Sequence, residues 1–116
     1  MKTLLVVDDE KNIRTLYQQD LSEEGFRVLI AETGIDAIDL VKREKVDLAI
    51  LDIKMPDMNG IETLKQLMEI NRDIKVILNT AYSFYKSDFS TWSADAYLIK
   101  SSDMSELKNK ITELLS

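Results

Sequence analysis

The residues whose types could do chemistry share one position in the chain: each stands where a short apolar run ends. They are Asp8, Asp9, Asp52, Thr80 and Lys100. Three carboxylates brought together would repel one another by about 4 kcal/mol per pair at ~4 Å and an effective dielectric constant near 20. Such a cluster needs a cation or raised carboxyl pKa values. Because carboxylates are hard oxygen ligands, we expect Mg²⁺ or Mn²⁺.

A hydroxyl, an ammonium and three carboxylates around a hard divalent cation make up a phosphoryl-transfer site. The cation and Lys100 would neutralise charge on the transferred group, and a carboxylate can be the nucleophile. A single aspartate at a strand end is more often a turn or cap residue, and a lone threonine or lysine there indicates less. The five residues together are a much more specific signal.

Five apolar runs would have to bring these residues together, and they lie at 4–7, 28–31, 48–51, 76–78 and 96–99. Nearly continuous apolar runs are typical of strands covered on both faces of a parallel sheet, and the spacing leaves room for a helix between them. The sequence therefore predicts an α/β fold of the (βα)5, flavodoxin-like type over the single domain 1–116. Its doubly wound five-stranded parallel sheet would have the order 2-1-3-4-5, so that the first and third strands bring the three aspartates together.

Helical patterns fill the segments between the runs. Ile13, Leu16, Tyr17 and Leu21 have the spacing of one buried stripe, and Gly25 is expected to end that helix. Three later helices are expected to begin at residues with an acidic side chain three positions on, namely Thr33, Asn59 and Asp103. Residues 82–92 contain mediocre helix formers, so the fourth helix of the scheme should be short or irregular.

Composition excludes several other classes of protein. The 116 residues include no cysteine and no histidine, which excludes disulfides, thiolate or imidazole metal ligands and a Ser-His triad. The net charge of −6, concentrated in residues 1–58, argues against direct binding to nucleic acid. No apolar run approaches the length of a membrane span, and the start turns acidic too soon for a signal peptide. We therefore expect a cytoplasmic protein that binds no membrane.

The sequence resembles the receiver domain of two-component response regulators over nearly its whole length. The matching segments are VVDDE at 6–10, LDIKMPDMNG at 51–60, NTA at 79–81 and ADAYLIK at 94–100. The resemblance implies that Asp52 takes a phosphoryl group from a phosphohistidine on a sensor histidine kinase or a histidine phosphotransfer protein. The chain would then be a signalling phosphoacceptor in a phosphorelay, with no enzyme activity beyond its own phosphorylation and dephosphorylation.

The same resemblance assigns roles around Asp52. Mg²⁺ would be bound by Asp9, Asp52 and the backbone carbonyl of Lys54, with help from Asp8. Lys100 would contact the phosphoryl group.

Two further residues would form the switch: Thr80 would move toward the phosphoryl group and Tyr97 would turn inward, changing a surface for partner binding. The residues two positions after Asp52 and Thr80, which are Lys54 and Tyr82, would tune the lifetime of the phosphoryl group.

The sequence departs from the family pattern on the switching side. Ser101 follows Lys100 where the family has proline, and a cis bond before serine would cost roughly 3 kcal/mol, so we expect a trans bond. In the aromatic-rich stretch, Tyr85, Phe89 and Trp92 have helical spacing. They would either pack on the sheet or form an exposed patch for a homodimer or a partner protein.

Three alternatives remain open at this point. A receiver that is never phosphorylated could act only as a protein-binding module. A phosphatase of the haloacid-dehalogenase type would need a second aspartate two residues after the nucleophile, where this chain has Lys54. A flavodoxin-like flavin protein would need a phosphate-binding loop where Asp8 and Asp9 would repel phosphate. As no segment follows Ser116 in the sequence, we expect a stand-alone module whose output passes through a downstream protein partner.

Overall fold

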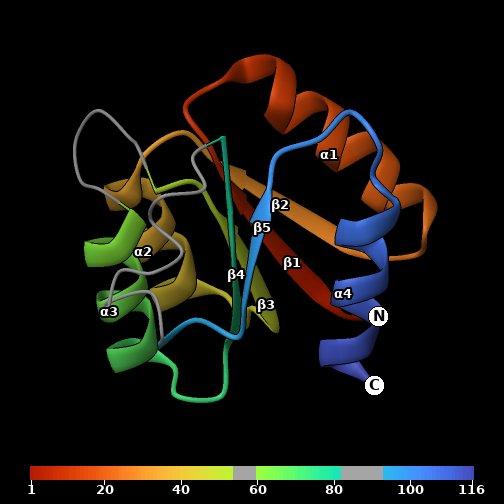
Figure 1. Cartoon of the computed structure of the whole chain (residues 1–116). Helices are drawn as coiled ribbons and strands as arrows, with labels where there is room; N and C mark the ends of the chain where they lie inside the picture. The colour runs from red at the N-terminus through yellow and green to blue at the C-terminus, as the bar shows by residue number, and fades with distance from the viewer. Residues whose placement is uncertain (54–59, 82–92) are drawn as a thin grey trace.

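Five parallel strands form one sheet in the computed structural model, which describes residues 1–53, 60–81 and 93–116. The strands are β1 (Thr3–Val7), β2 (Arg27–Ala31), β3 (Leu48–Leu51), β4 (Lys75–Thr80) and β5 (Ala96–Ile99). The helices are α1 (Lys11–Glu23), α2 (Gly34–Arg43), α3 (Gly60–Ile70) and α4 (Ser105–Leu115). The sheet order is β2-β1-β3-β4-β5, which confirms the predicted topology (Figure 1).

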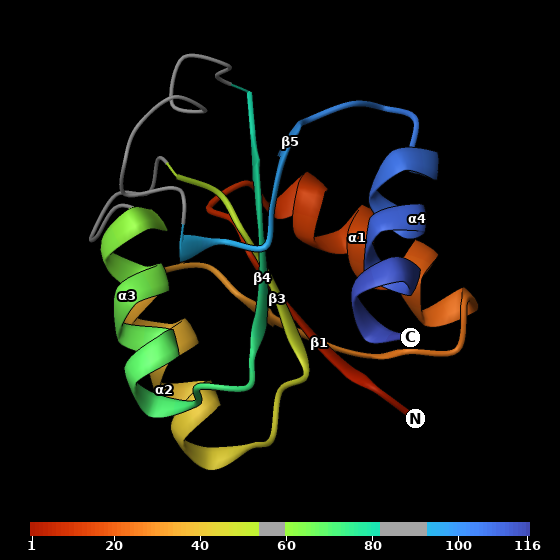
Figure 2. The same ribbon diagram turned by 60° about the horizontal axis from the view of Figure 1, so that its bottom comes forward.

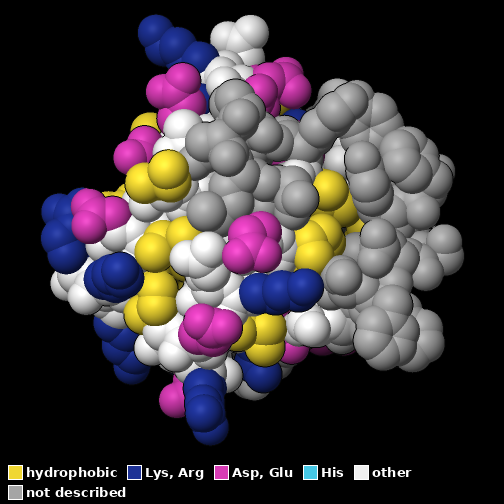
Figure 3. All heavy atoms as spheres, turned by 90° about the vertical axis from the view of Figure 1, so that its left-hand side faces the viewer, with side chains coloured by type: hydrophobic (Ala, Val, Ile, Leu, Met, Phe, Trp, Pro, Cys, Tyr) yellow, Lys and Arg dark blue, Asp and Glu magenta, His cyan; other side chains and the backbone are white. Residues whose placement is uncertain are grey.

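The helices cover both faces of the sheet. Figures 1 and 2 show α1 and α4 on one face and α2 and α3 on the other. Alternate residues of each strand enter different cores: in β1, Leu5 and Val7 face α2 and α3, whereas Leu4 and Val6 face α1 and α4. Seen as spheres from the side of α2 and α3, the surface mixes apolar, acidic and basic side chains (Figure 3). Burial on both faces explains why the strand sequences are nearly continuous apolar runs.

Two predicted helix boundaries are confirmed. The Thr33 hydroxyl accepts a hydrogen bond from the Asp36 N–H at 3.1 Å, which caps α2. Gly25 follows α1 with a φ of +94°, and the N–H of Phe26 donates to the carbonyl of Leu21. Such a left-handed glycine is a common way for a helix to end, because it has no Cβ to clash.

Two other local predictions are wrong. Leu16 is 40% exposed and does not belong to the buried stripe of α1, which consists of the half-buried Ile13 and the buried Tyr17 and Leu21. Side chains four apart follow one narrow face of a helix, and Leu16 falls on its flank. Asp103 does not occupy the cap position of α4, which begins at Ser105. Its carboxylate instead accepts the Ser105 N–H at 2.9 Å in a turn just before the helix.

Several predictions fall on residues outside the described part of the chain. They concern the cap at Asn59, the fourth helix at 82–92, and the roles of Lys54, Tyr82, Tyr85, Phe89 and Trp92.

The Lys100–Ser101 peptide bond is trans, as expected. Among the described helices, none combines the length and the hydropathy that crossing a bilayer requires.

Candidate functional site

The ends of four strands meet at one edge of the sheet, and backbone hydrogen bonds fix their relative positions. The Asp8 N–H donates to the Ala31 carbonyl at 3.1 Å, and the Asp52 N–H donates to the Val7 carbonyl at 3.1 Å. The Lys100 N–H donates to the Thr80 carbonyl at 2.8 Å. The sheet therefore places Asp8, Asp52, Thr80 and Lys100 at its carboxyl edge, where ligands bind in open α/β sheets. The predicted switch residue Tyr97 lies further back, at the second position of β5.

Lys100 lies at the centre of the site. Its Nζ is 2.8 Å from Oδ2 of Asp8, 2.9 Å from Oδ2 of Asp52 and 3.4 Å from Oε1 of Glu10. The side chains of Asp8 and Asp52 are only 4% and 7% exposed, whereas that of Glu10 is 61% exposed. The positive charge of Lys100 thus compensates the negative charges of two buried carboxylates, and the carboxylate of Glu10 lies on the solvent-exposed side of the ammonium.

The pKa values of the site follow from burial and this ion pairing. Burial raises the pKa of the Asp8 carboxyl, although hydrogen bonds from Lys100 and from the Glu10 N–H act in the opposite direction. Burial by itself would lower the pKa of Lys100, but the hydrogen bonds from its ammonium to Asp8 and Asp52 outweigh it and raise that pKa above its ordinary value. Lys100 is therefore a permanent cation in the site at neutral pH.

Three successive acidic residues after β1 form a group that could hold a metal ion. Carboxylate oxygens of Asp8, Asp9 and Glu10 all lie within 4.8 Å of one another. Asp8 is buried and anchored, since its Oδ1 accepts the Glu10 N–H at 2.9 Å and its carbonyl accepts from Nη1 of Arg14 at 2.8 Å. Asp9 is exposed and open to solvent. Hard oxygen donors at this density fit Mg²⁺ or Mn²⁺.

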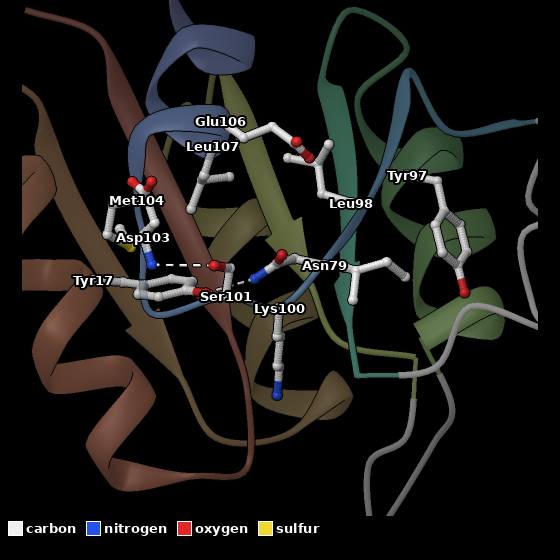
Figure 4. Close-up of a pocket in the computed structure, with 11 residues that line it drawn as sticks. Tyr17, Asn79, Tyr97, Leu98, Lys100, Ser101, Asp103, Met104, Glu106 and Leu107 are labelled. Carbon is white, nitrogen blue, oxygen red and sulfur yellow. Dashed lines mark hydrogen bonds between the residues drawn. The ribbon is translucent and has the colours of Figure 1, made fainter.

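The two predicted switch residues take up different positions. Thr80 is fully buried at the end of β4, directly beside Lys100 in the backbone ladder. Tyr97 is half-buried and packs against the core under α2 and α3. Figure 4 shows its ring on the opposite side of β5 from Tyr17.

Gly60, the first residue of α3, lies against the backbone of the Asp52 segment. Its N–H donates to the Ile53 carbonyl at 2.6 Å. A Cβ at this position would overlap the Asp52 carbonyl oxygen and lie 2.7 Å from Cα of Ile53. The start of α3 therefore reaches the backbone of Asp52 only because residue 60 has no side chain.

A buried polar pair connects β4 to α1 near Lys100. The side-chain amide of Asn79, in β4, donates to the hydroxyl of Tyr17, in α1, at 2.7 Å. Both residues are at most 4% exposed. Figure 4 shows this bond beside a hollow that Lys100 and the start of α4 also line.

Sequence reasoning gave no role to Glu10, Gly60 or the Tyr17–Asn79 pair. One signal was available for the pair: Asn79 is a polar residue that directly follows the apolar run Val76–Leu78 of β4. Nothing local to Tyr17 marked it as the partner, because 62 residues separate the two in the chain.

Comparison with known proteins gives a consistent family. The family model of the response regulator receiver domain matches residues 4–112. Sporulation initiation phosphotransferase F of Bacillus subtilis is 34% identical over 97% of this chain and 92% of its own length. The transcriptional regulatory protein ZraR of Klebsiella oxytoca is 37% identical, and there the match covers 97% of this chain but 26% of that protein.

Two similar solved structures contain one protein, the response regulator TrrA. TrrA of Thermotoga maritima in complex with Mg²⁺-BeF is 46% identical, with a TM-score of 0.94 over 98% of this chain and 99% of that chain. In the complex of histidine kinase ThkA with TrrA, the matching chain is 47% identical, with a TM-score of 0.93 over 100% of both chains.

Proposed function

Because this chain belongs to the response regulator receiver domain family, we propose that Asp52 accepts a phosphoryl group from a phosphohistidine on a sensor histidine kinase or a histidine phosphotransfer protein. The observation that carries the proposal is the shared ammonium: Lys100 contacts both Asp8 and Asp52 within 2.9 Å at the carboxyl edge of the sheet. A receiver kept only as a binding module has no need of this buried charge cluster, which costs desolvation energy. This favours phosphorylation over the binding-only alternative.

In the proposed reaction, a carboxylate oxygen of Asp52 attacks the phosphorus atom of the phosphohistidine. A P–O bond forms and the P–N bond breaks, the electron pair stays on the imidazole nitrogen, and that nitrogen takes a proton from water. Before the attack, the ammonium of Lys100 lies 2.9 Å from Oδ2 of Asp52 and compensates the negative charge of that carboxylate. Afterwards the same ammonium can hydrogen-bond to an oxygen of the phosphoryl group, where negative charge has accumulated.

The acidic residues would hold the divalent cation. Asp8, Asp9 and Asp52, with the backbone carbonyl of Lys54, are the proposed ligands, and Glu10 adds a carboxylate within 4.8 Å of the first two. When bound, Mg²⁺ or Mn²⁺ would neutralise the charge that builds up on the phosphoryl oxygens. The complex of TrrA with Mg²⁺-BeF supports this proposal for a relative.

The response would pass through Thr80 and Tyr97. Thr80 follows Asn79 in β4 and lies beside Lys100, so a phosphoryl group on Asp52 would offer new acceptor oxygens to its hydroxyl. Displacement of Thr80 would open space into which Tyr97 could turn, changing the surface around β5. Lys54 and Tyr82 would tune the lifetime of the phosphoryl group. A homodimer or partner surface that includes Tyr85, Phe89 and Trp92 is part of the same proposal.

The proposed partners follow from this chemistry. A histidine kinase or phosphotransfer protein would supply the phosphoryl group, as the complex of ThkA with TrrA supports for a relative. A downstream protein would read the changed surface, and the proposed location is the cytoplasm. The chain would turn over no substrate of its own, beyond gaining and losing its phosphoryl group. A phosphatase of the haloacid-dehalogenase type is disfavoured because Lys54 occupies the position of the second aspartate.

The test uses phosphoramidate, a small donor that needs no partner protein, with Mg²⁺ and detection by intact mass. We expect one Mg²⁺-dependent phosphoryl adduct on the wild type and none on Asp52→Asn. Asp39→Asn is a matched control, because Asp39 is an exposed aspartate paired only with Arg43 in α2 among the ion pairs described. Absence of the adduct from folded wild-type protein would reject the proposal and favour the binding-only module.

A further inference from the structure

The hydrogen bond between Tyr17 and Asn79 connects α1, which follows the acidic residues 8–10, to β4, which adjoins Lys100. The amide of Asn79 donates to the Tyr17 hydroxyl at 2.7 Å, and both side chains are buried. A buried amide left without a partner costs about 1–3 kcal/mol, so any movement that breaks this hydrogen bond is unfavourable. Two apolar side chains could fill the same space, but they would not restrain the relative position of the two elements in this way.

Asn79 belongs to the part of the site that carries Lys100. It pairs in register with Leu98 of β5, and the next pair is Thr80 with Ile99. The carbonyl of Thr80 then accepts the Lys100 N–H at 2.8 Å. The position of β4 at Asn79 therefore sets the point from which the Lys100 side chain departs.

Tyr17 belongs to the part that carries the acidic residues. Its helix, α1, begins directly after Glu10, and the Glu10 carbonyl accepts the Arg14 N–H at 3.1 Å. The guanidinium of Arg14 in turn donates to the Asp8 carbonyl at 2.8 Å. The first turns of α1 thus hold the acidic loop, and Tyr17 lies two turns from its start.

The Tyr17–Asn79 hydrogen bond lies at the border of the core, beside a pocket that is partly open to solvent. A hollow of about 360 Å³ lies beside the pair and is lined by Tyr17, Asn79, Lys100, Met104 and Leu107 (Figure 4). Because no side chain fills the pocket on this side of the pair, the hydrogen bond adds a directional restraint to the packing of Tyr17 in the core.

We propose that Tyr17 and Asn79 are positioning residues for phosphoryl transfer, and that their hydrogen bond holds Lys100 in register with the acidic loop. This inference rests on the proposed function of Asp52. Asp8 is held from two sides: the Lys100 ammonium lies 2.8 Å from its carboxylate, and Arg14 of α1 donates to its backbone carbonyl. The Tyr17–Asn79 bond connects α1 to β4, which adjoins Lys100. Without this bond, Lys100 can shift relative to Asp52.

Three variants separate positioning from simple stability. Tyr17→Phe keeps the ring and removes the hydroxyl, Asn79→Leu keeps the volume and removes the amide, and the double variant restores an apolar pair. Gln18→Met is the matched control, because Gln18 is the next residue of α1 and its amide donates to the Val28 carbonyl of β2 at 3.2 Å, away from Lys100.

The first measurement is the phosphorylation rate with phosphoramidate as a function of Mg²⁺ concentration. We expect the three variants to react about tenfold more slowly at saturating Mg²⁺, since small misplacements of a reacting group cost up to about a hundredfold. The Mg²⁺ concentration for half-maximal rate should stay unchanged, because α1 still holds Asp8 through Arg14. Gln18→Met should react like the wild type. The double variant should recover resistance to urea but remain slow.

The second measurement is hydrogen exchange of the Lys100 amide, which needs no phosphorylation. We expect exchange to be about tenfold faster in Tyr17→Phe than in the wild type and unchanged in Gln18→Met. A double variant that reacts at the wild-type rate, or a Lys100 amide with unchanged exchange, would overturn the positioning role. If the wild type takes up no phosphoryl group, the proposed function fails, and the exchange experiment still decides whether the pair holds Lys100.

Discussion

Nζ of Lys100 and Oδ2 of Asp52 lie 2.9 Å apart, although 48 residues separate them in the chain. The same ammonium lies 2.8 Å from Asp8; the two carboxylates are buried, and the side chain of Lys100 is 12% exposed. Lys100 is therefore the counter-ion of the resting site as well as the proposed contact of the phosphoryl group. Any event that adds negative charge to Asp52 or positive charge to the acidic loop must redistribute these contacts.

Removal of the Lys100 charge should destabilise the protein when no divalent cation is present. Lys100→Met leaves the buried carboxylates of Asp8 and Asp52 facing each other without compensation. Breaking a buried ion pair in this way costs about 3–5 kcal/mol. We expect a loss of at least ~3 kcal/mol in the free energy of unfolding, measured with urea at neutral pH in the presence of EDTA.

Lys108→Met is the control for this experiment. Lys108 pairs with Glu24 at 3.3 Å, but the two side chains are 32% and 49% exposed, so the loss should stay below about 1 kcal/mol. Equal losses for the two variants would show that Lys100 does not act as a buried counter-ion.

Mg²⁺ should stabilise the folded chain through Asp8. At a Mg²⁺ concentration of about 100 times its dissociation constant, binding to the native state alone adds about 2.7 kcal/mol to the free energy of unfolding. Asp8→Asn should lose this gain, whereas Asp39→Asn, on the exposed face of α2, should keep it. Urea unfolding with Mg²⁺ and with EDTA measures the difference. An equal gain in Asp8→Asn would place the cation elsewhere.

Gly60→Ala should damage both stability and phosphorylation. The added methyl group would overlap the Asp52 carbonyl, and such overpacking costs about 1–3 kcal/mol. It would also displace the backbone of Asp52, so labelling by phosphoramidate should slow at least severalfold. Gly25→Ala is the comparison: its φ of +94° makes alanine unfavourable by about 1–2 kcal/mol, but nothing lies within 4 Å of the added Cβ, and Gly25 precedes the start of β2, at the opposite end of that strand from the carboxyl edge. If both variants labelled at the same rate, the close approach of Gly60 would have no bearing on Asp52.

Stability at alkaline pH should depend on Tyr17. Burial raises the pKa of its phenol above the ordinary value of 10.0, and the hydrogen bond from Asn79 offsets this only in part. A pKa that is higher in the folded state gives stability that is present below about pH 10 and is lost as pH rises through the folded value. The free energy of unfolding, measured with urea between about pH 9 and pH 11, should therefore fall more steeply with pH for the wild type than for Tyr17→Phe. Lys100, whose pKa is also raised, contributes equally to both proteins. Parallel profiles would mean that the Tyr17 phenol is not protected from ionisation.

The sheet and most of its helices could be predicted because their signals are local. Five apolar runs were visible without any knowledge of tertiary contacts, and the strand order followed from the fold class. Thr33 and Gly25 were predictable for the same reason, since a cap or a left-handed stop depends on neighbouring residues. Leu16 was not, because whether a residue on the flank of a helix is covered depends on what packs there.

The site was predictable as a list of residues and less so as a set of contacts. Strand ends place Asp8, Asp52 and Lys100 at one edge, but nothing local indicates that one ammonium contacts both carboxylates. Glu10 and the pair of Tyr17 with Asn79 depend on where α1 lies relative to β4, which is set by tertiary packing.

The central claim is that Asp52 is the phosphoacceptor, and the most direct test locates the phosphoryl group in the chain. Wild-type protein treated with phosphoramidate and Mg²⁺ is reduced with borohydride, which converts an aspartyl phosphate to homoserine, and its peptides are sequenced by mass spectrometry. We predict homoserine at position 52, with Asp8 and Asp9 unchanged. Homoserine at position 8 or 9, or at no position in folded protein, would contradict the account.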